Sequence, residues 1–367
     1  MTDPDAVARG WKGPPPREIC IVMLSAIGDA VHVLPVANAL KRHWPDSRIT
    51  WVIQPVPHQL VKDHPAIDDF IVFDRRRGAE ALDSIRSFRD AARPRRFDLV
   101  LGLQVYLKAG ILTAILDADV KLGFDRERAR DAQWLFTNER IPPHAPQHVQ
   151  DQYFEFLTHL GVPIEPVEWR LDFSAEERQA QSDFFSRINP PVCAVVVGTS
   201  KPEKNWTVEG YARVLEVVQD RYGMQPVLVG GPSPSERSTA DQVIERSGAS
   251  ILNELGDDLR RLTWLVDGAA LLISPDTGPL HIARALGTPV VGLFGYTNPR
   301  RSGPYQAYQD LVVDGYARHP GEDYPIEHAY RDGMKRIRVD GVLQKVHEAI
   351  ERYVEPSSDT QSGETHG

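Results

Sequence analysis

From Ile19 onward, short apolar runs alternate with amphipathic stretches of helical spacing, and this alternation limits the fold more than any other feature of the sequence. Strands that are joined by crossover helices lie parallel in a sheet, so the pattern predicts an α/β protein with doubly wound sheets. In the first half we expect strands at 19–24, 49–53, 70–73, 99–103 and 120–123, and helices at 29–43, 79–92 and 108–116.

A second series of the same kind begins near Val192. It predicts strands at 192–197, 226–229, 271–274 and 290–294, and helices at 208–222, 236–247, 259–266 and 279–286. We therefore expect two Rossmann-like domains, 17–165 and 191–340, joined by a proline- and charge-rich linker at 166–190 and facing each other across a cleft. A further helix is expected at 341–355, and the ends, 1–16 and 356–367, are expected to be disordered.

Composition narrows the class of protein. Of 367 residues, 41% are hydrophobic and 25% charged, as in a soluble globular protein. No apolar run approaches the ~20 residues of a membrane-spanning helix, and the N-terminus lacks the apolar core of a secretory signal, so we expect a cytoplasmic protein. Cys20 and Cys193 lie in apolar runs and are expected to be buried. A net charge of −9 argues against nucleic acid as a partner, and the basic run Arg93–Arg96 is interpreted as a solvated face.

The segment from Ser274 to His281 carries the functional prediction. A strand that ends in a carboxylate and passes through Thr-Gly into a helix places free backbone N–H groups and the positive helix end at the carboxyl edge of a sheet, where anions bind. Asp276, Thr277, Gly278 and His281 all lie near the start of that helix. The segment is therefore expected to hold a phosphate, although the same residues could serve only as a helix cap with a tight turn.

A second carboxylate is placed in the same way in the first half. Asp29 follows the strand 19–24 and begins the helix that runs to His43, which puts its side chain at the carboxyl edge of the first sheet. A carboxylate there can take the proton of an attacking hydroxyl group. The alternative is that Asp29 only caps the helix.

Three segments together resemble the heptosyltransferase family, glycosyltransferase family 9, whose members extend the core of bacterial lipopolysaccharide. They are Leu-Ser-Ala-Ile-Gly-Asp-Ala-Val-His-Val-Leu-Pro at 24–35, Asp-Thr-Gly-Pro-Leu-His at 276–281, and the Phe-Gly-Tyr-Thr-Asn-Pro loop that begins at Phe294. The resemblance implies the two-domain GT-B fold. It also implies that the second domain binds the nucleotide, that the first takes the acceptor, and that the final helix packs back on the first domain.

The resemblance implies roles for individual residues as well. Asp29 would be the catalytic base, with Gly28 and His32 on the acceptor side, and Lys204 would neutralise the donor phosphates, with Lys201 as the alternative. Nucleotide-sugar binding would fall to Ser200, Gly230, Glu236, Asp276, Thr277, Gly278 and His281. Glu236 could equally stand in the first turn of a helix, where a carboxylate favours the dipole.

We therefore expect an inverting, metal-independent glycosyltransferase that moves a heptose from ADP-heptose onto a lipopolysaccharide-core or other glycan acceptor. No cofactor is implied beyond the nucleotide-sugar substrate, and the sequence has no cluster with metal-ligand spacing. The acceptor, a glycan or glycolipid, would be reached at the inner membrane surface. Met23 and Tyr296 depart from the family pattern and leave the sugar open. A nucleotide-sugar epimerase of the same architecture and a catalytically silent nucleotide-binding protein are the alternatives.

Overall fold

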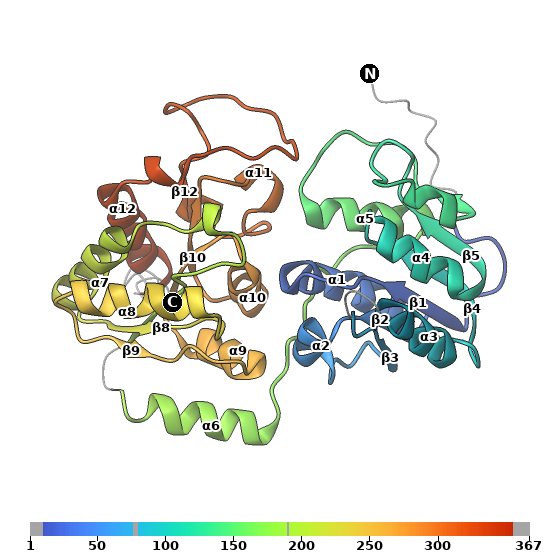
Figure 1. The fold of residues 1–367 in the computed structure, drawn as a ribbon, viewed down its shortest axis with the longest axis horizontal. Helices are drawn as coiled ribbons and strands as arrows, with labels where there is room; N and C mark the ends of the chain where they lie inside the picture. The colour runs from blue at the N-terminus through green and yellow to red at the C-terminus, as the bar shows by residue number, and fades with distance from the viewer. Residues whose placement is uncertain (1–9, 76–79, 189–190, 355–367) are drawn as a thin grey trace, which may run out of the picture. The chain divides into compact units, whose positions relative to one another are not determined.

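The computed structural model describes residues 10–75, 80–188 and 191–354, which form two compact α/β units (Figure 1). The first unit ends at Asp172 and the second begins at Phe173, inside the segment 166–190 that is expected to be a linker. Each unit is built around one six-stranded parallel sheet, so the predicted fold class is confirmed.

The sheet of the first unit has the strand order β3-β2-β1-β4-β5-β6. Its strands are β1 (Glu18–Val22), β2 (Arg48–Ile53), β3 (Asp69–Val72), β4 (Arg96–Gly102), β5 (Asp117–Gly123) and β6 (Glu139–Arg140). Ile19 pairs with Ile49 on one side and with Leu99 on the other, and none of the three side chains is exposed. Strands of a parallel sheet are apolar on both faces because helices cover both. This is why unbroken apolar runs predict them.

The helices of the first unit are α1 (Ile27–His43), α2 (Pro55–Val61), α3 (Ala81–Ala92), α4 (Leu107–Ile115) and α5 (Val149–Leu160), with a 3₁₀ turn η2 (Gln133–Phe136) between β5 and β6. All residues of α1 from Ala30 to Leu40 are buried, and α5 packs against this helix. α2 and α5 lie outside the predicted elements.

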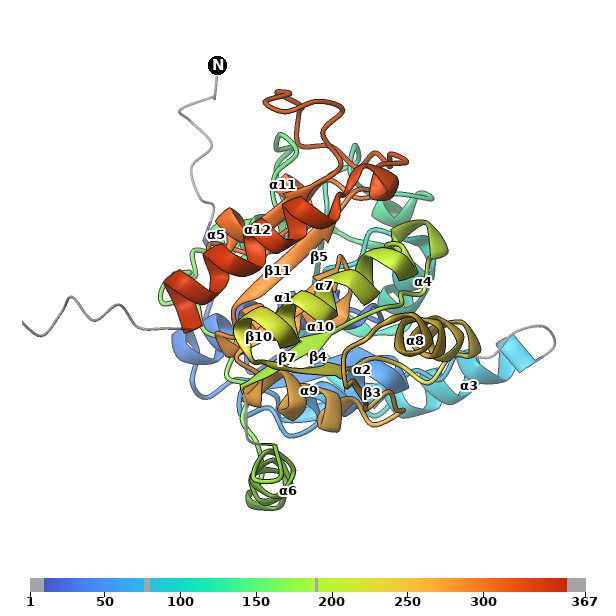
Figure 2. The same ribbon diagram turned by 90° about the vertical axis from the view of Figure 1, so that its left-hand side faces the viewer.

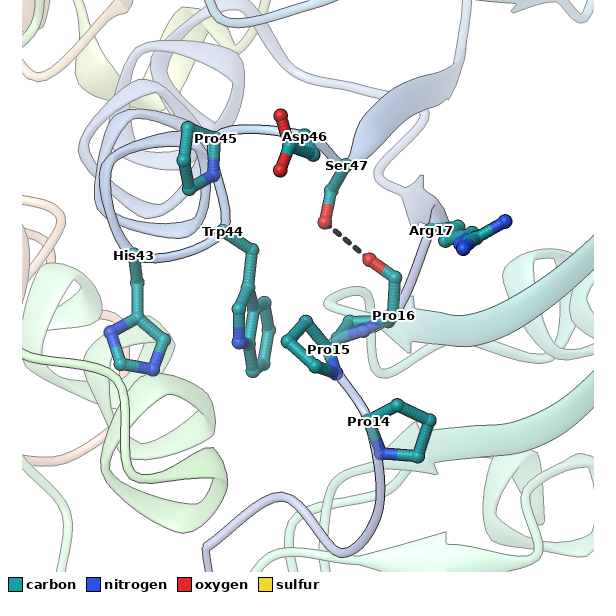
Figure 3. Close-up of a pocket in the computed structure, with 9 residues that line it drawn as sticks. All are labelled: Pro14, Pro15, Pro16, Arg17, His43, Trp44, Pro45, Asp46 and Ser47. Carbon is teal, nitrogen blue, oxygen red and sulfur yellow. Dashed lines mark hydrogen bonds between the residues drawn. The ribbon is translucent and has the colours of Figure 1, made fainter.

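The segment 10–16, part of the tail expected to be disordered over 1–16, has a defined structure. The ring of Trp11 meets that of Trp44 edge-on, with 6.0 Å between the ring centroids. The three prolines at 14–16 line a pocket of about 290 Å³ beside Trp44 (Figure 3). The contact between the two indole rings and the hydrogen bond from the backbone N–H of Trp11 to the carbonyl of Leu160 at 2.9 Å thus hold a segment whose composition is typical of a tail. Residues 1–9 lie outside the described part of the chain.

The sheet of the second unit has the order β12-β11-β10-β7-β8-β9. Its strands are β7 (Val192–Val195), β8 (Gln225–Leu228), β9 (Leu252–Asn253), β10 (Leu271–Pro275), β11 (Val290–Phe294) and β12 (Val312–Asp314). Its helices include α6 (Ala175–Phe185), α7 (Val208–Tyr222), α8 (Pro234–Arg246), α9 (Leu259–Gly268), α10 (Gly278–Leu286) and α11 (Pro299–Ser302), and a 3₁₀ turn η3 (Pro202–Lys204) follows β7. Val195, Ile273 and Val291, on three adjacent strands, form the centre of its core.

The final helix, α12 (Val339–Ala349), belongs to this second core. Val342, Val346 and Ala349 follow one another at spacings of four and three residues, and all three are fully buried among the core residues of the second unit. Figure 2 shows α12 alongside α7 and in front of β11, and it contacts both. The family resemblance implies that this helix packs back on the first domain, and this expectation is wrong for α12, because its apolar stripe is part of the second unit's core. The polar tail 356–367 lies outside the described residues.

The predicted linker also contains a helix. Residues 175–185 form α6, which begins with a capping box between Ser174 and Glu177. Gln181 donates a hydrogen bond to the carbonyl of Trp264 at 2.8 Å, and Arg260 pairs with Glu177 at 2.6 Å, so α6 is fastened to α9. Only part of 166–190 therefore acts as a connection.

Candidate active site

Asp276 is the centre of a polar cluster in the second unit. It follows β10 directly and precedes α10, and its side chain is only 9% exposed. The ammonium of Lys204 donates to Oδ2 of Asp276 and to its carbonyl oxygen, both at 2.8 Å. The Thr297 hydroxyl donates to the same Oδ2 at 2.6 Å, and Nε2 of His281 lies 3.5 Å from Oδ1. Residues from three separate segments therefore converge on one carboxylate.

The surroundings of Asp276 keep it ionised. Burial disfavours the charged form and on its own would raise the pKa of the carboxyl group. The hydrogen bond with His281 and the positive charge of Lys204 outweigh burial and hold the pKa of Asp276 well below its usual range. Asp276 is therefore a fixed anion that positions a cation, and it is not suited to accept a proton near neutral pH.

The start of α10 provides the second part of an anion site. Thr277 is the N-cap residue, with extended backbone angles of φ −152° and ψ 173°, but its side chain makes no capping hydrogen bond. Gly278 and Pro279 open the helix. The hydroxyl of Thr277 and the first backbone N–H groups of the helix are thus placed where a phosphate binds at a helix N-terminus. The Thr277 side chain therefore does not cap α10, and the binding of a phosphate at this helix start stays a prediction.

Glu236 is held by the backbone at the carboxyl end of β8. The N–H of Gly231 donates to its Oε1 at 3.1 Å, and the Ser233 hydroxyl donates to its Oε2 at 2.6 Å. A Cβ atom added to Gly198 would lie 2.4 Å from Cγ of Glu236, so only glycine fits at the end of the neighbouring strand. Gly230 has a φ of +154°, in the region that favours glycine. Glu236 does stand in the first turn of α8, and it is also fixed at the sheet edge.

The two candidate lysines differ in their contacts. Lys204 reaches Asp276, whereas the ammonium of Lys201 lies 4.8 Å from the ring centroid of Tyr330 and 5.8 Å from that of Tyr296. Ser200, between β7 and η3, is exposed. Its neighbour Thr199 is buried, and the Thr199 hydroxyl donates to the carbonyl of Lys201 at 2.6 Å, which fixes the loop. Lys204 is therefore the lysine of the Asp276 cluster.

In the first unit, Asp29 lies in the first turn of α1. Its Oδ2 accepts a hydrogen bond from the backbone N–H of Ala26 at 2.9 Å, which is a capping contact. Its Oδ1 accepts one from the hydroxyl of Tyr153 at 3.3 Å, so the carboxylate is also oriented from α5. The charge of Asp29 also acts on Lys108. Burial is the largest influence on the pKa of Lys108 and lowers it, the charge of Arg75 lowers it further, and the charge of Asp29 opposes both effects.

The two acceptor-side predictions fall in different surroundings. Gly28 is partly exposed beside Asp29 at the start of α1. His32, one turn further, is only 4% exposed; its Nδ1 lies 2.9 Å from Oε1 of Gln150, and the Gln150 amide donates to the His32 carbonyl at 2.9 Å. His32 therefore braces α1 against α5 from the interior of the unit.

Some residues of the cluster are absent from the sequence-based prediction. Thr297 and Ser302 both approach Asp276, with the Ser302 hydroxyl 3.4 Å from Oδ2. Thr297 lies within the Phe294 loop that contributes to the family resemblance, and that loop is the only signal that could have identified it. Its contact with Asp276 spans 21 positions of sequence and depends on the packing of β11 beside β10.

The structure also shows the state of the two cysteines, the arrangement of possible metal ligands and the length of the apolar helices. Both cysteines are buried, and burial raises the pKa of the Cys193 thiol to about 12. Within 10–75, 80–188 and 191–354, no group of three or more His, Cys, Asp or Glu side chains is arranged to hold a metal ion. No helix in that part of the chain is long and apolar enough to cross a bilayer.

Two doubly wound units in one chain are the architecture of the GT-B class. In the second unit, Lys204 and the start of α10 lie at the carboxyl edge of the sheet, where ligands of such sheets bind. The chain belongs to glycosyltransferase family 9, the heptosyltransferase family, whose model matches residues 85–324. It is therefore a glycosyltransferase, as the sequence motifs predict.

Individual relatives agree with this assignment. The lipopolysaccharide core heptosyltransferase OpsX of Haemophilus influenzae is 32% identical over 84% of this chain and 87% of its own length. A family 9 glycosyltransferase from Veillonella parvula has a TM-score of 0.76 at 24% identity, covering 91% of this chain and 97% of that one. The Escherichia coli heptosyltransferase WaaC with ADP-2-deoxy-2-fluoro heptose has a TM-score of 0.70 at 23% identity, covering 90% and 99%. These structures confirm the GT-B fold.

Proposed function

We propose that this chain is an inverting, metal-independent glycosyltransferase that moves a heptose from ADP-heptose onto a lipopolysaccharide-core or other glycan acceptor. The observation that carries the proposal is the cluster around Asp276, because it holds a lysine beside the open start of a helix. The names of the relatives support the sugar: OpsX is a lipopolysaccharide core heptosyltransferase, and the WaaC structure contains an ADP-linked heptose analogue.

On the donor side, the second unit binds the diphosphate. The Lys204 ammonium has three N–H donors. Among the described residues, two of them bond to Asp276, one to its carboxylate and one to its carbonyl oxygen. The third can reach an oxygen of the donor, while the Thr277 hydroxyl and the N–H groups of α10 contact the same group. As the bond between the sugar and the phosphate breaks, negative charge grows on the leaving ADP, and these fixed donors stabilise it. Ser200, Gly230 and Glu236 lie at the same sheet edge and complete the nucleotide-sugar site.

On the acceptor side, Asp29 is the general base. The acceptor hydroxyl attacks the anomeric carbon, its proton passes to the Asp29 carboxylate, and ADP leaves with the electron pair of the broken bond. A single displacement of this kind inverts the anomeric configuration. The Tyr153 hydroxyl and the Ala26 N–H orient the two carboxylate oxygens, so that the base is held in one position. Gly28 gives the acceptor access to this carboxylate.

We propose that no metal is needed, because the remaining N–H donor of Lys204, the Thr277 hydroxyl and the N–H groups of α10 can bond to the diphosphate oxygens that a divalent ion would otherwise contact. We also propose that the acceptor is a glycolipid and that the enzyme meets it at the cytoplasmic face of the inner membrane. The lipopolysaccharide relatives support this acceptor class.

The test is transfer by the full chain from ADP-heptose to a lipopolysaccharide that lacks core heptose, followed as ADP release and as the mass gain of one heptose. We expect transfer from the ADP-linked donor, no transfer from UDP- or GDP-linked sugars, an inverted anomeric carbon by NMR, and a rate in EDTA within about twofold of the untreated rate. Conversion of the donor without an acceptor would instead identify an epimerase. ADP binding without any turnover would identify a silent nucleotide-binding protein.

A further inference from the structure

Lys201 is held by a pair of stacked tyrosines rather than by a carboxylate. The rings of Tyr296 and Tyr330 lie 4.6 Å apart at an angle of 13°, and the Lys201 ammonium lies within 5.8 Å of both centroids. Tyr330 is 47% exposed, and its other neighbour is the ring of His328 at 5.2 Å. Among the described residues, Lys201 forms no ion pair, so its charge is not offset locally. We call Lys201, Tyr296 and Tyr330 the lysine clasp.

Each member of the lysine clasp is tied to the Asp276 cluster. The N–H of Lys204 donates to the carbonyl of Lys201 at 2.9 Å across η3. Tyr296 immediately precedes Thr297, whose hydroxyl bonds to Asp276. Arg331, next to Tyr330, donates its N–H to the carbonyl of Tyr296 at 3.0 Å, which brings the third segment to the same place. The clasp therefore lies beside the proposed donor site.

The charges of this region leave a role for a second cation. Asp276 offsets the charge of Lys204, so the pair alone presents little net charge to a ligand. A nucleoside diphosphate carries about two to three negative charges near neutral pH, because its last phosphate ionisation lies near pH 6. Lys201 lies against the tyrosine rings, and among the described residues no carboxylate pairs with it. A cation–π contact does not use the N–H donors of the ammonium, so the lysine can keep its contact with the rings while it donates to a phosphate.

We infer that Lys201 is a second cation that contacts the diphosphate of the nucleotide donor. Tyr296 and Tyr330 position its ammonium without neutralising the charge. The inference rests on the proposed function only in that a nucleoside diphosphate binds at Asp276. It assigns to Lys201 a contact that Lys204 alone does not provide, and it explains why the Phe294 loop carries a tyrosine at position 296.

The experiment measures the affinity of the full chain for ADP by calorimetry. Lys201→Met removes the charge and keeps most of the volume, and we expect ADP to bind about tenfold more weakly. Lys201→Arg keeps the charge and should stay within about threefold of the wild type. Lys335→Met is the matched control, because Lys335 is 83% exposed in the same unit and lies 4.0 Å from Asp332; its loss should leave ADP affinity unchanged.

A double-mutant cycle tests the part played by the tyrosines. Tyr330→Leu should weaken ADP binding about threefold, Tyr330→Phe should not, and Tyr330→Leu should have no further effect once Lys201 is Met. Additive losses would show that Tyr330 acts independently of Lys201 and would overturn the clasp.

Other outcomes decide the rest of the inference. ADP affinity of Lys201→Met within twofold of the wild type, with an unchanged melting temperature, would overturn the diphosphate contact. An equal loss in Lys335→Met would show only a general charge effect and would overturn it as well. Lys201→Gln provides a second neutral variant if Lys201→Met does not fold. If the wild type binds ADP but transfers no heptose, the proposed function is wrong and this inference still stands. If the wild type binds UDP in place of ADP, the affinities of the same variants for UDP decide the inference by the same criteria.

Discussion

The ammonium of Lys204 lies 2.8 Å from Oδ2 of Asp276 and 2.8 Å from the carbonyl oxygen of the same residue. The lysine thus contacts both the end of β10 and the residue that leads into α10, so it reinforces the turn as well as offsetting the carboxylate charge. Because Asp276 is 9% exposed and Lys204 19%, the pair is shielded from screening by solvent and salt.

Removing Lys204 should affect both binding and stability. We expect Lys204→Met to weaken ADP binding at least tenfold, because it removes an N–H donor and leaves the negative charge of Asp276 uncompensated next to the helix start. It should also lower the free energy of unfolding by about 2 kcal/mol, because Asp276 is left buried with fewer partners. Calorimetry with ADP and urea unfolding measure the two effects. Loss of stability with unchanged ADP affinity would leave Lys204 as a structural residue only.

Asp276 should make the stability of the protein depend on pH in the acid range. Its folded pKa lies below the unfolded value of about 3.9, so its contribution is complete above that value and is lost as the pH falls toward the folded pKa. Asn cannot titrate. The difference in unfolding free energy between the wild type and Asp276→Asn should therefore be constant from pH 7 to pH 5 and shrink by about 1 kcal/mol at pH 3. A difference that stays constant down to pH 3 in urea titrations would contradict this assignment of charge.

The described helices and strands show which parts of such a fold a sequence can predict. The apolar runs at β1, β4, β10 and β11 predict strands because these strands are buried on both faces. β9 and β12 have only two and three residues and carry no periodicity. α6 has no buried residue, so its sequence has no apolar face to detect, although Ser174 and Glu177 form a capping box.

The candidate site likewise contains residues that could be predicted from local sequence and residues that could not. Asp276, Thr277 and Gly278 are consecutive and could be predicted together, because a strand end and a helix start are local features. Lys204 could be predicted only through the family resemblance, and Thr297 and Ser302, which come from the loop after β11, were not predicted. The sheet against which the final helix packs was not predicted correctly either. Nothing in the local pattern of α12 states which sheet its apolar stripe will cover.

The position of α12 leads to a prediction of stability. Val346 is fully buried in the core of the second unit, so Val346→Ala should lower the free energy of unfolding by about 2 kcal/mol through lost burial and the cavity that remains. Gln344→Ala, on the exposed side of the same helix, should change it by less than about 0.5 kcal/mol. Equal effects of the two substitutions in urea unfolding would show that the valine stripe is not part of the core.

Tyr153 offers a graded test of how the base is oriented. Its hydroxyl donates to Oδ1 of Asp29 at 3.3 Å, a long hydrogen bond, so Tyr153→Phe should slow turnover only about threefold and leave ADP affinity unchanged. Steady-state kinetics with ADP-heptose as donor measure both quantities. A loss as large as that caused by substitution of Asp29 itself would make Tyr153 a direct participant in proton transfer.

Turnover by Asp29→Asn separates catalysis from capping most directly. Asn keeps an oxygen that can accept from the N–H of Ala26, so the cap and the melting temperature should be preserved, whereas the proton acceptor is lost. We expect normal ADP affinity and sugar transfer at least a hundredfold slower than in the wild type, within the usual range for a general base. Transfer at close to the wild-type rate would contradict the role of Asp29 as the base and leave it as a helix cap.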